Sequence, residues 1–227
     1  MSIYRSVPIQ SSSLPPGIGY IIGNEAAERF SFYGMRSILL AYMTMYLVQP
    51  NGEAQLFQEK EAEAWVHLFV GSAYFFPLIG GILADAYWGK YKTILSLSLF
   101  YCLGHGCLAL MGLVGDTKAW LMAGLVLIAI GSGGIKPCVS AHVGDQFNRR
   151  NHHLLSKVFG WFYFSINIGA FLSGLLTPFL LQATCEKGTL GAWIYPYVEF
   201  WVGQKARGEP IFGPHYAFGL PGILMAV

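Results

Sequence analysis

The chain has 227 residues, of which 54% are hydrophobic and only 11% are charged, and its formal net charge is +2. An average soluble domain has about 25% charged residues, so this composition indicates a membrane protein. The small net charge gives no support for nucleic-acid binding, and no nucleic-acid partner is expected. Residues 1–17 lack the basic start and apolar core of a signal peptide, and we interpret them as a tail.

The first apolar segment, residues 19–48, contains four charged side chains, namely Glu25, Glu28, Arg29 and Arg36. On a helix, positions three, four and seven apart share a face, so these charges form one stripe together with Phe32 and Tyr33. A lone charge near the middle of a bilayer costs about 2.5–3.5 kcal/mol on insertion scales, so such residues face a bundle interior or a water-filled cavity. This stripe is the first candidate functional site.

Further apolar runs of spanning length follow the first segment. A helix needs about 20 residues to cross the hydrocarbon of a bilayer. Runs of this length lie at 65–84, 93–114, 120–143 and 159–182. We therefore expect an all-α, polytopic membrane helix bundle with five transmembrane helices in 18–182. Residues 215–227 are expected to start a sixth, truncated helix, as in the front part of a longer protein.

The connections between the first five spans are short and polar, which predicts that helices adjacent in sequence are antiparallel neighbours. Residues 183–214 are the exception, since they are rich in Trp and Tyr but too polar to span. Amphipathic aromatic residues favour the headgroup region, so we expect an extracytoplasmic loop lying along the interface. The alternative is a disordered insertion, since long loops vary widely between related proteins.

The distribution of basic residues between the loops favours a cytoplasmic N-terminus. With that orientation, the inside segments hold six Lys and Arg and the outside segments five. Three of the outside five lie in the long 183–214 segment, and long loops count less in the positive-inside rule. The expected location is a bacterial inner (plasma) membrane, with residues 1–17 as a cytoplasmic tail.

Lys136 is a further charged residue inside an apolar run, after a glycine run and directly before Pro137. Glycine and proline can open a helix backbone and admit water. Alternatively, the lysine reaches the cytoplasmic interface with its long side chain. Together with the stripe, Lys136 gives three bases and two acids in the membrane. This surplus of positive charge suits an anionic group such as a carboxylate.

Two other polar groups accompany these charges. In the fifth span, Asn167 and Tyr163 lie one turn apart, where they can join helices or contribute to a site. Between the second and third spans, Asp85, Lys90 and Lys92 form a cytoplasmic turn that can link helices by charge pairing. The four cysteines have no metal-ligand or disulfide-framework spacing, so no metal site is expected.

Three of these segments resemble a known family. Residues 25–34, EAAERFSFYG, resemble the ExxERFxYYG signature of the proton-dependent oligopeptide transporters, a branch of the major facilitator superfamily. Residues 162–169, FYFSINIG, are similar to that family's FYxxINxG motif, and residues 80–92 to the superfamily's GxLADxxxGrr turn. The resemblance covers about 18–182 and resumes at 213–219. It implies the N-terminal six-helix half of a major facilitator fold and proton-coupled symport of di- and tripeptides by alternating access.

The resemblance also implies roles for individual residues. Positions that line the family's peptide site, with the bases near the peptide carboxylate, correspond to Arg36, Tyr33, Tyr74, Lys136, Tyr163 and Asn167. Proton-coupling positions correspond to Glu25, Glu28, Arg29 and His67. For His67, a buried structural histidine is the alternative. Asp85, Lys90 and Lys92 correspond to the gating turn. Phe32 stands where the family usually has tyrosine, so one hydroxyl is missing.

The implied partners are di- and tripeptides, protons, the lipid bilayer and a second six-helix half that is missing from this sequence. Neither an enzymatic activity nor a cofactor is expected, the proton being the coupling ion. One alternative is a transporter of another small anionic solute in the same superfamily, and another is a truncated membrane protein without transport. An intramembrane enzyme with buried Glu and His is a further alternative, although HExxH, GxSxG and paired-aspartate spacings are absent from the sequence.

Overall fold

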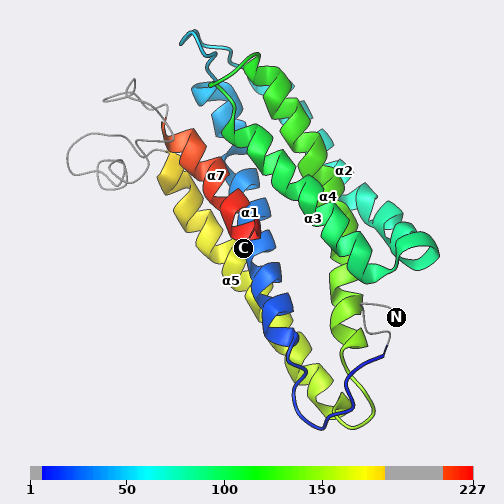
Figure 1. Cartoon of the computed structure of the whole chain (residues 1–227). Coiled ribbons are helices and arrows are strands. Elements are labelled where there is room, and N and C mark those ends of the chain that lie inside the picture. The colour runs from blue at the N-terminus through cyan, green and yellow to red at the C-terminus, as the bar shows by residue number, and fades with distance from the viewer. Residues whose placement is uncertain (1–6, 182–211, 227) are drawn as a thin grey trace.

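The computed structural model describes residues 7–181 and 212–226, and these residues form a bundle of helices (Figure 1). Its long helices are α1 (Ile18–Ala41), α2 (Glu59–Leu83), α3 (Lys90–Ala109), α4 (Thr117–Asp145), α5 (Leu155–Leu181) and α7 (Phe212–Ala226). The short helical turns are η1 (Tyr42–Tyr46), η2 (Ala84–Trp88) and η3 (His152–Leu154). The described ranges contain no β-strand. The predicted interfacial loop lies almost entirely outside them, and α7 begins at its end.

Within residues 7–181 and 212–226, four helical stretches are long and apolar enough to cross a membrane, namely Glu59–Trp88, Lys90–Ala109, Thr117–Asp145 and His152–Leu181. α1 has 24 residues, about 36 Å at 1.5 Å per residue, but its four charges set it apart from these apolar spans. α7 has 15 residues. The predicted all-α membrane bundle is confirmed, with α1 as a charged helix beside four apolar ones.

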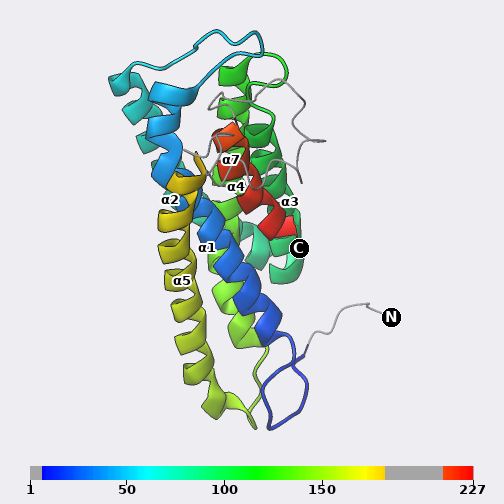
Figure 2. The same cartoon turned by 90° about the vertical axis from the view of Figure 1, so that its left-hand side faces the viewer.

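The helices pack in two groups. α1 lies along α5 and α7, whereas α4 lies along both α2 and α3, as Figures 1 and 2 show. α3 and α4 are antiparallel neighbours, as expected, but α1 and α2 touch only over a short stretch. The prediction that all sequential helices are close neighbours is therefore wrong for α1 and α2. It is also wrong for α2 and α3 and for α4 and α5, which make almost no direct contact. Residues 47–58, which include a β-bridge between Val48 and Ala54, connect α1 to α2 and let α2 reach α4.

Glycines set the short distances between α4 and its neighbours. A Cβ atom at Gly80 of α2 would collide with the backbone of Gly134 in α4. One at Gly131 would lie 2.7 Å from the backbone nitrogen of Tyr101 in α3. Small residues allow such approaches in a membrane, where burial of apolar surface gives little drive for association. α4 stays helical through Pro137, so the backbone opening expected near Lys136 is not observed.

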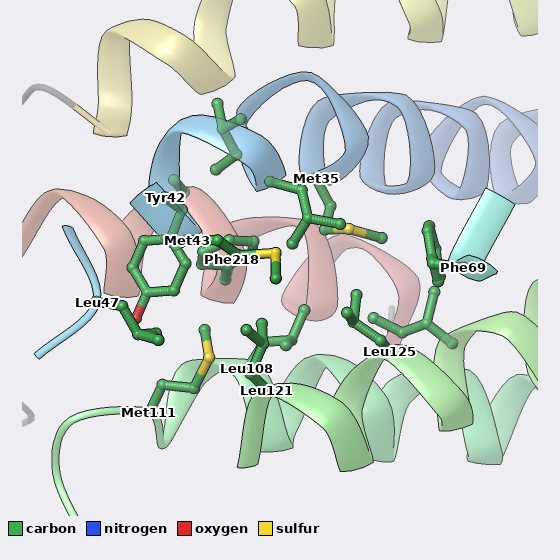
Figure 3. Close-up of a cluster of buried hydrophobic side chains, with 14 of the residues drawn as sticks. Met35, Tyr42, Met43, Leu47, Phe69, Leu108, Met111, Leu121, Leu125 and Phe218 are labelled. Carbon is green, nitrogen blue, oxygen red and sulfur yellow. The ribbon is translucent and has the colours of Figure 1, made fainter. Parts of the chain in front are cut away.

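The larger buried apolar cluster contains residues from α1, α2, α3, α4, α5 and α7, and Figure 3 shows part of it. Met43 of η1, Leu108 of α3 and Leu121 of α4 are at most 1% exposed. Phe218 of α7 is fully buried, and its ring lies edge-on to Tyr42 with the centroids 5.0 Å apart. α7 therefore contributes to the core and holds α1 against α3.

The described part of the N-terminal tail is attached to the connection between α4 and α5. Asn148 donates hydrogen bonds from Nδ2 to the carbonyl oxygens of Ile9 and Ser11, at 2.6 and 3.1 Å. Asn151 donates to the carbonyl of Ser13 at 3.0 Å. Both asparagines are buried. Their amide groups satisfy tail carbonyls that have no helical partner, which fixes the entry into α1.

Candidate functional site

Three charged side chains of α1 form a buried ionic group. Arg29 Nε lies 2.7 Å from Glu25 Oε1, to which it donates a hydrogen bond, and 3.1 Å from Glu28 Oε2. Glu25, Glu28 and Arg29 are 3%, 2% and 9% exposed. One guanidinium therefore faces two carboxylates in a region of low dielectric, where charges interact strongly. The group has a formal excess of negative charge, which a proton or another cation can offset.

Glu28 is also contacted from α3 and α4. Ser132 of α4 donates a hydrogen bond from Oγ to Glu28 Oε1 at 2.5 Å. Ser31 donates to the backbone carbonyl of Glu28 at 2.9 Å, and its Oγ lies 2.5 Å from the hydroxyl of Tyr101 in α3. These contacts were missed in the sequence, because a serine in a glycine run and a tyrosine in an apolar span carry no signal of their own. They fix both the backbone and the side chain of Glu28.

Lys136 lies one turn after Ser132 on α4 and meets aromatic rings. Its Nζ is 4.4 Å from the centroid of the Phe32 ring and 5.6 Å from that of Tyr74. Such cation–π contacts stabilise an ammonium group. In the part of the chain that the structure describes, no carboxylate lies within ion-pair distance of Lys136. Phe32, at the position where tyrosine was expected, thus supplies a ring face to this lysine.

The remaining residues expected to bind substrate lie mostly on open surface. Tyr33 is partly buried, while Arg36, Tyr74, Tyr163 and Asn167 are exposed. The Asn167 amide donates to the Tyr163 carbonyl of its own helix at 2.8 Å, so the described residues show no interhelical bond for it. The structure brings Tyr74 to Lys136 but shows no hydrogen bond or ion pair of Arg36 within the described ranges. The roles of these residues stay predictions.

His67 on α2 is exposed. The alternative interpretation, a histidine buried for structural reasons, is therefore wrong. Its expected link to proton coupling stays a prediction, because the described residues show no hydrogen bond or ion pair that joins it to Glu25, Glu28 or Arg29.

The predicted gating turn is held by a residue outside it. Lys90 Nζ lies 2.7 Å from Asp145 Oδ2, which joins the start of α3 to the end of α4. Asp85 and Lys92 are exposed and form no ion pair among the described residues. Charge pairing at this turn thus involves Asp145, which the sequence pattern did not single out. An exposed pair of this kind contributes about 0–1 kcal/mol to stability.

Comparison with known proteins gives related transporters. A family model described as the POT family matches residues 91–227. "Peptide transporter family 1" of Drosophila melanogaster is 47% identical over 172 residues, which cover 73% of this chain and 22% of the relative. "Solute carrier family 15 member 2" of Homo sapiens is 36% identical and covers 98% of this chain and 27% of the relative. The chain thus spans about a quarter of these curated relatives.

Solved structures agree with these matches. The crystal structure of the POT family transporter PepTSo is 40% identical with a TM-score of 0.71, and the match covers 94% of this chain and 36% of that chain. A mutant peptide transporter POT in complex with alafosfalin is 29% identical with a TM-score of 0.72, covering 97% and 38%. From the family match, the relatives and the shared arrangement of helices, we conclude that this chain belongs to the POT family, the proton-dependent oligopeptide transporters.

Proposed function

We propose that the complete protein is a proton-coupled symporter of di- and tripeptides that works by alternating access, with this chain as its N-terminal half. The observation that carries the proposal is the buried group of Glu25, Glu28 and Arg29, with one guanidinium between two carboxylates. Intramembrane ionisable residues are costly and mark transport pathways. The matched relatives named as peptide transporters support the choice of substrate.

Coupling follows from the excess of acid over base in this group. A proton on one carboxylate neutralises it and weakens its attraction to Arg29. The cluster and Lys136 then have two bases and only one ionised acid. A peptide carboxylate can pair with a base by charge-assisted hydrogen bonds, so binding of the proton favours binding of the peptide. Loss of the proton reverses this preference and favours release.

The peptide site in this proposal is formed by Arg36, Tyr33, Tyr74, Lys136, Tyr163 and Asn167. A charged or amide side chain that faces hydrocarbon is expensive, so the exposure of Arg36 and Asn167 supports a water-filled cavity rather than contact with lipid. A second six-helix half would form the other wall of that cavity. The small share of each relative that the chain covers is consistent with this partner.

The protein is a multi-pass membrane protein, and we propose a cytoplasmic N-terminus from the distribution of Lys and Arg between the loops. A bacterial inner (plasma) membrane stays a prediction, and the relatives described above come from a fly and a human. We propose no enzymatic activity and no cofactor other than the transported proton. No observation favours transport of another anionic solute over transport of peptides.

Transport by the complete protein in liposomes tests this proposal. With an inward proton gradient, a radiolabelled dipeptide should accumulate above its external concentration, and a protonophore should abolish the accumulation. Accumulation that is insensitive to the protonophore would contradict proton coupling. Uptake of a small organic anion without uptake of any dipeptide would contradict the proposed substrate.

A further inference from the structure

Glu28 is held by a hydroxyl from another helix. We propose that Ser132 of α4 is a positioning residue for Glu28. Its hydroxyl donates a hydrogen bond to Oε1 of the carboxylate, and Oε2 is thereby left as the oxygen that takes up the proton. The inference rests on the proposed function in so far as this proton is the transported one. The hydrogen bond itself can be tested without transport.

The direction of the Ser132 hydroxyl is unusual for a serine within a helix. Such serines commonly donate to a backbone carbonyl three or four residues earlier in their own helix. Ser165 and Ser173 of α5 do so, at 2.8 Å to Phe162 and 2.9 Å to Ala170. Ser132 is fully buried and instead donates across to Glu28 of α1 at 2.5 Å. A donor that gives up its local acceptor for a carboxylate makes a charge-assisted bond, which is the stronger kind.

Close packing on both sides keeps Ser132 in this position. Its neighbour Gly131 lies so close to α3 that a Cβ atom there would be 2.8 Å from the Leu97 carbonyl oxygen. Its other neighbour, Gly133, lies against α2, where a Cβ atom would be 2.6 Å from Cβ of Phe76. α4 therefore cannot rotate or shift at this level without a clash. The hydroxyl is presented to Glu28 by a rigid element.

The two oxygens of the Glu28 carboxylate are in different environments. Oε1 accepts the Ser132 hydrogen bond, whereas Oε2 is a buried oxygen that accepts no hydrogen bond from any described residue. Oε2 lies 3.1 Å from Arg29 Nε, whose hydrogen is directed to Glu25. A proton that binds at Oε2 forms an O–H bond and removes the attraction between Glu28 and Arg29. The Ser132 bond to Oε1 can persist in both protonation states.

The infrared band of the protonated carboxylic acid tests this arrangement in the purified complete protein. The difference between spectra at acidic and neutral pH isolates the acid carbonyl stretch, and its loss in Glu28→Gln assigns it. Because an acid carbonyl that loses its donor absorbs at higher wavenumber, Ser132→Ala should move the band upward. Ser132→Thr keeps the hydroxyl and should restore the wild-type position. Ser173→Ala, the same change at another fully buried serine, should leave the band unmoved.

Ser132→Cys, which is similar in size but a weak donor, is the second variant if Ser132→Ala does not fold, and it should move the band in the same direction. A band that stays in place in both variants would overturn the inference, even if wild-type transport is proton-driven. Loss of the band in Glu25→Gln rather than in Glu28→Gln would also overturn it. These outcomes are read from the purified protein, so they stay decisive if the liposome assay rejects the proposed function.

Transport adds a readout that a merely structural role would not move. Hydrogen bonds to charged groups correspond to roughly a tenfold effect or more, so Ser132→Ala should reduce proton-driven uptake by about that factor and leave counterflow of peptide measurable. In a Glu28→Gln background, where proton-driven uptake is itself expected to be lost, Ser132→Ala should leave the remaining counterflow unchanged, because residues that act through one another are not additive. An additional tenfold loss of counterflow in that background would contradict the positioning role.

Discussion

Arg36 is the base of α1 that lies apart from the ionic group and is exposed. If it pairs with the peptide carboxylate, Arg36→Ala should reduce uptake of free dipeptides by roughly tenfold or more, because a charge-assisted hydrogen bond is lost. Uptake of C-terminally amidated dipeptides, which lack that charge, should change little. Competition against a labelled dipeptide measures both ligands in the complete protein.

Arg149→Ala is the matched control, since Arg149 is also exposed but lies in the connection between α4 and α5. It should affect neither ligand. Equal losses for free and amidated peptides in Arg36→Ala would assign Arg36 a structural role and remove it from the peptide site.

Several residue contacts could be predicted from the sequence, and others could not. The spacing of Glu25, Glu28 and Arg29 on one helix requires that they meet, and the structure places them together in the interior. Ser132 and Tyr101 could not be found in this way, because their contacts depend on which faces of α3 and α4 meet α1. The difference between exposed Arg36 and buried Arg29 could not be foreseen either. The two residues share a face of α1 but lie about two turns apart, and their burial depends on which neighbouring helices cover each turn.

At the scale of the helices, the contact of α2 with α4 depends on the absence of side chains. Gly80→Ala would place a methyl group against the backbone of Gly134, so α2 and α4 must separate. Overpacking of this kind typically costs about 1–3 kcal/mol. We therefore expect a lower midpoint of thermal unfolding for the purified complete protein.

Gly81→Ala is a control on the same helix, because a Cβ atom at Gly81 meets nothing within 4 Å. Alanine has the higher helix propensity, by up to about 1 kcal/mol, so this variant should be as stable as the wild type or more stable. Equal unfolding midpoints for the Gly80→Ala and Gly81→Ala variants would show that the close contact between Gly80 and Gly134 does not determine the stability of the protein.

The connection between α3 and α4 contains an acid with a predicted pH response. Asp116 accepts side-chain hydrogen bonds from Gln55 at 2.8 Å and Gln49 at 3.0 Å, and a backbone bond from Ala119. These bonds, that from Gln55 first, hold the pKa of Asp116 below its usual value. The sign follows from linkage: the stabilisation is present above the unfolded-state pKa, about 3.9, and is lost as pH falls through the lower folded-state pKa.

Asp116→Asn removes the charge that strengthens these bonds. Its thermal unfolding midpoint should lie below that of the wild type at pH 7, and the difference should shrink as the pH approaches 3. A difference that is constant over this range would mean that the charge of Asp116 contributes nothing to the connection.

At the scale of the whole molecule, the sequence indicated the fold class and the family, but not the arrangement of the helices. Hydropathy identifies apolar spans, yet it cannot show that α2 packs on α4 instead of on α1. That choice depends on small residues such as Gly80 and Gly134, whose partners lie on helices distant in sequence. Hydropathy also cannot explain why polar residues such as Arg36 and Asn167 are exposed. In our proposal they face a cavity that this chain shares with a second half of the transporter.

Proton coupling through α1 is the central claim, and Glu25→Gln/Glu28→Gln in the complete protein tests it most directly. Glutamine keeps the volume and hydrogen bonding of the side chain but cannot titrate, so the comparison separates protonation from packing. His67→Gln is the companion variant and should have the smaller effect, because His67 lies on the surface of α2.

The decisive measurement is concentrative dipeptide uptake under an inward proton gradient, set beside counterflow without a gradient. We predict that the double variant loses concentrative uptake and retains counterflow, since exchange of peptide requires no net proton movement. Concentrative uptake that persists in the double variant would contradict the account and place the proton site outside the ionic group of α1.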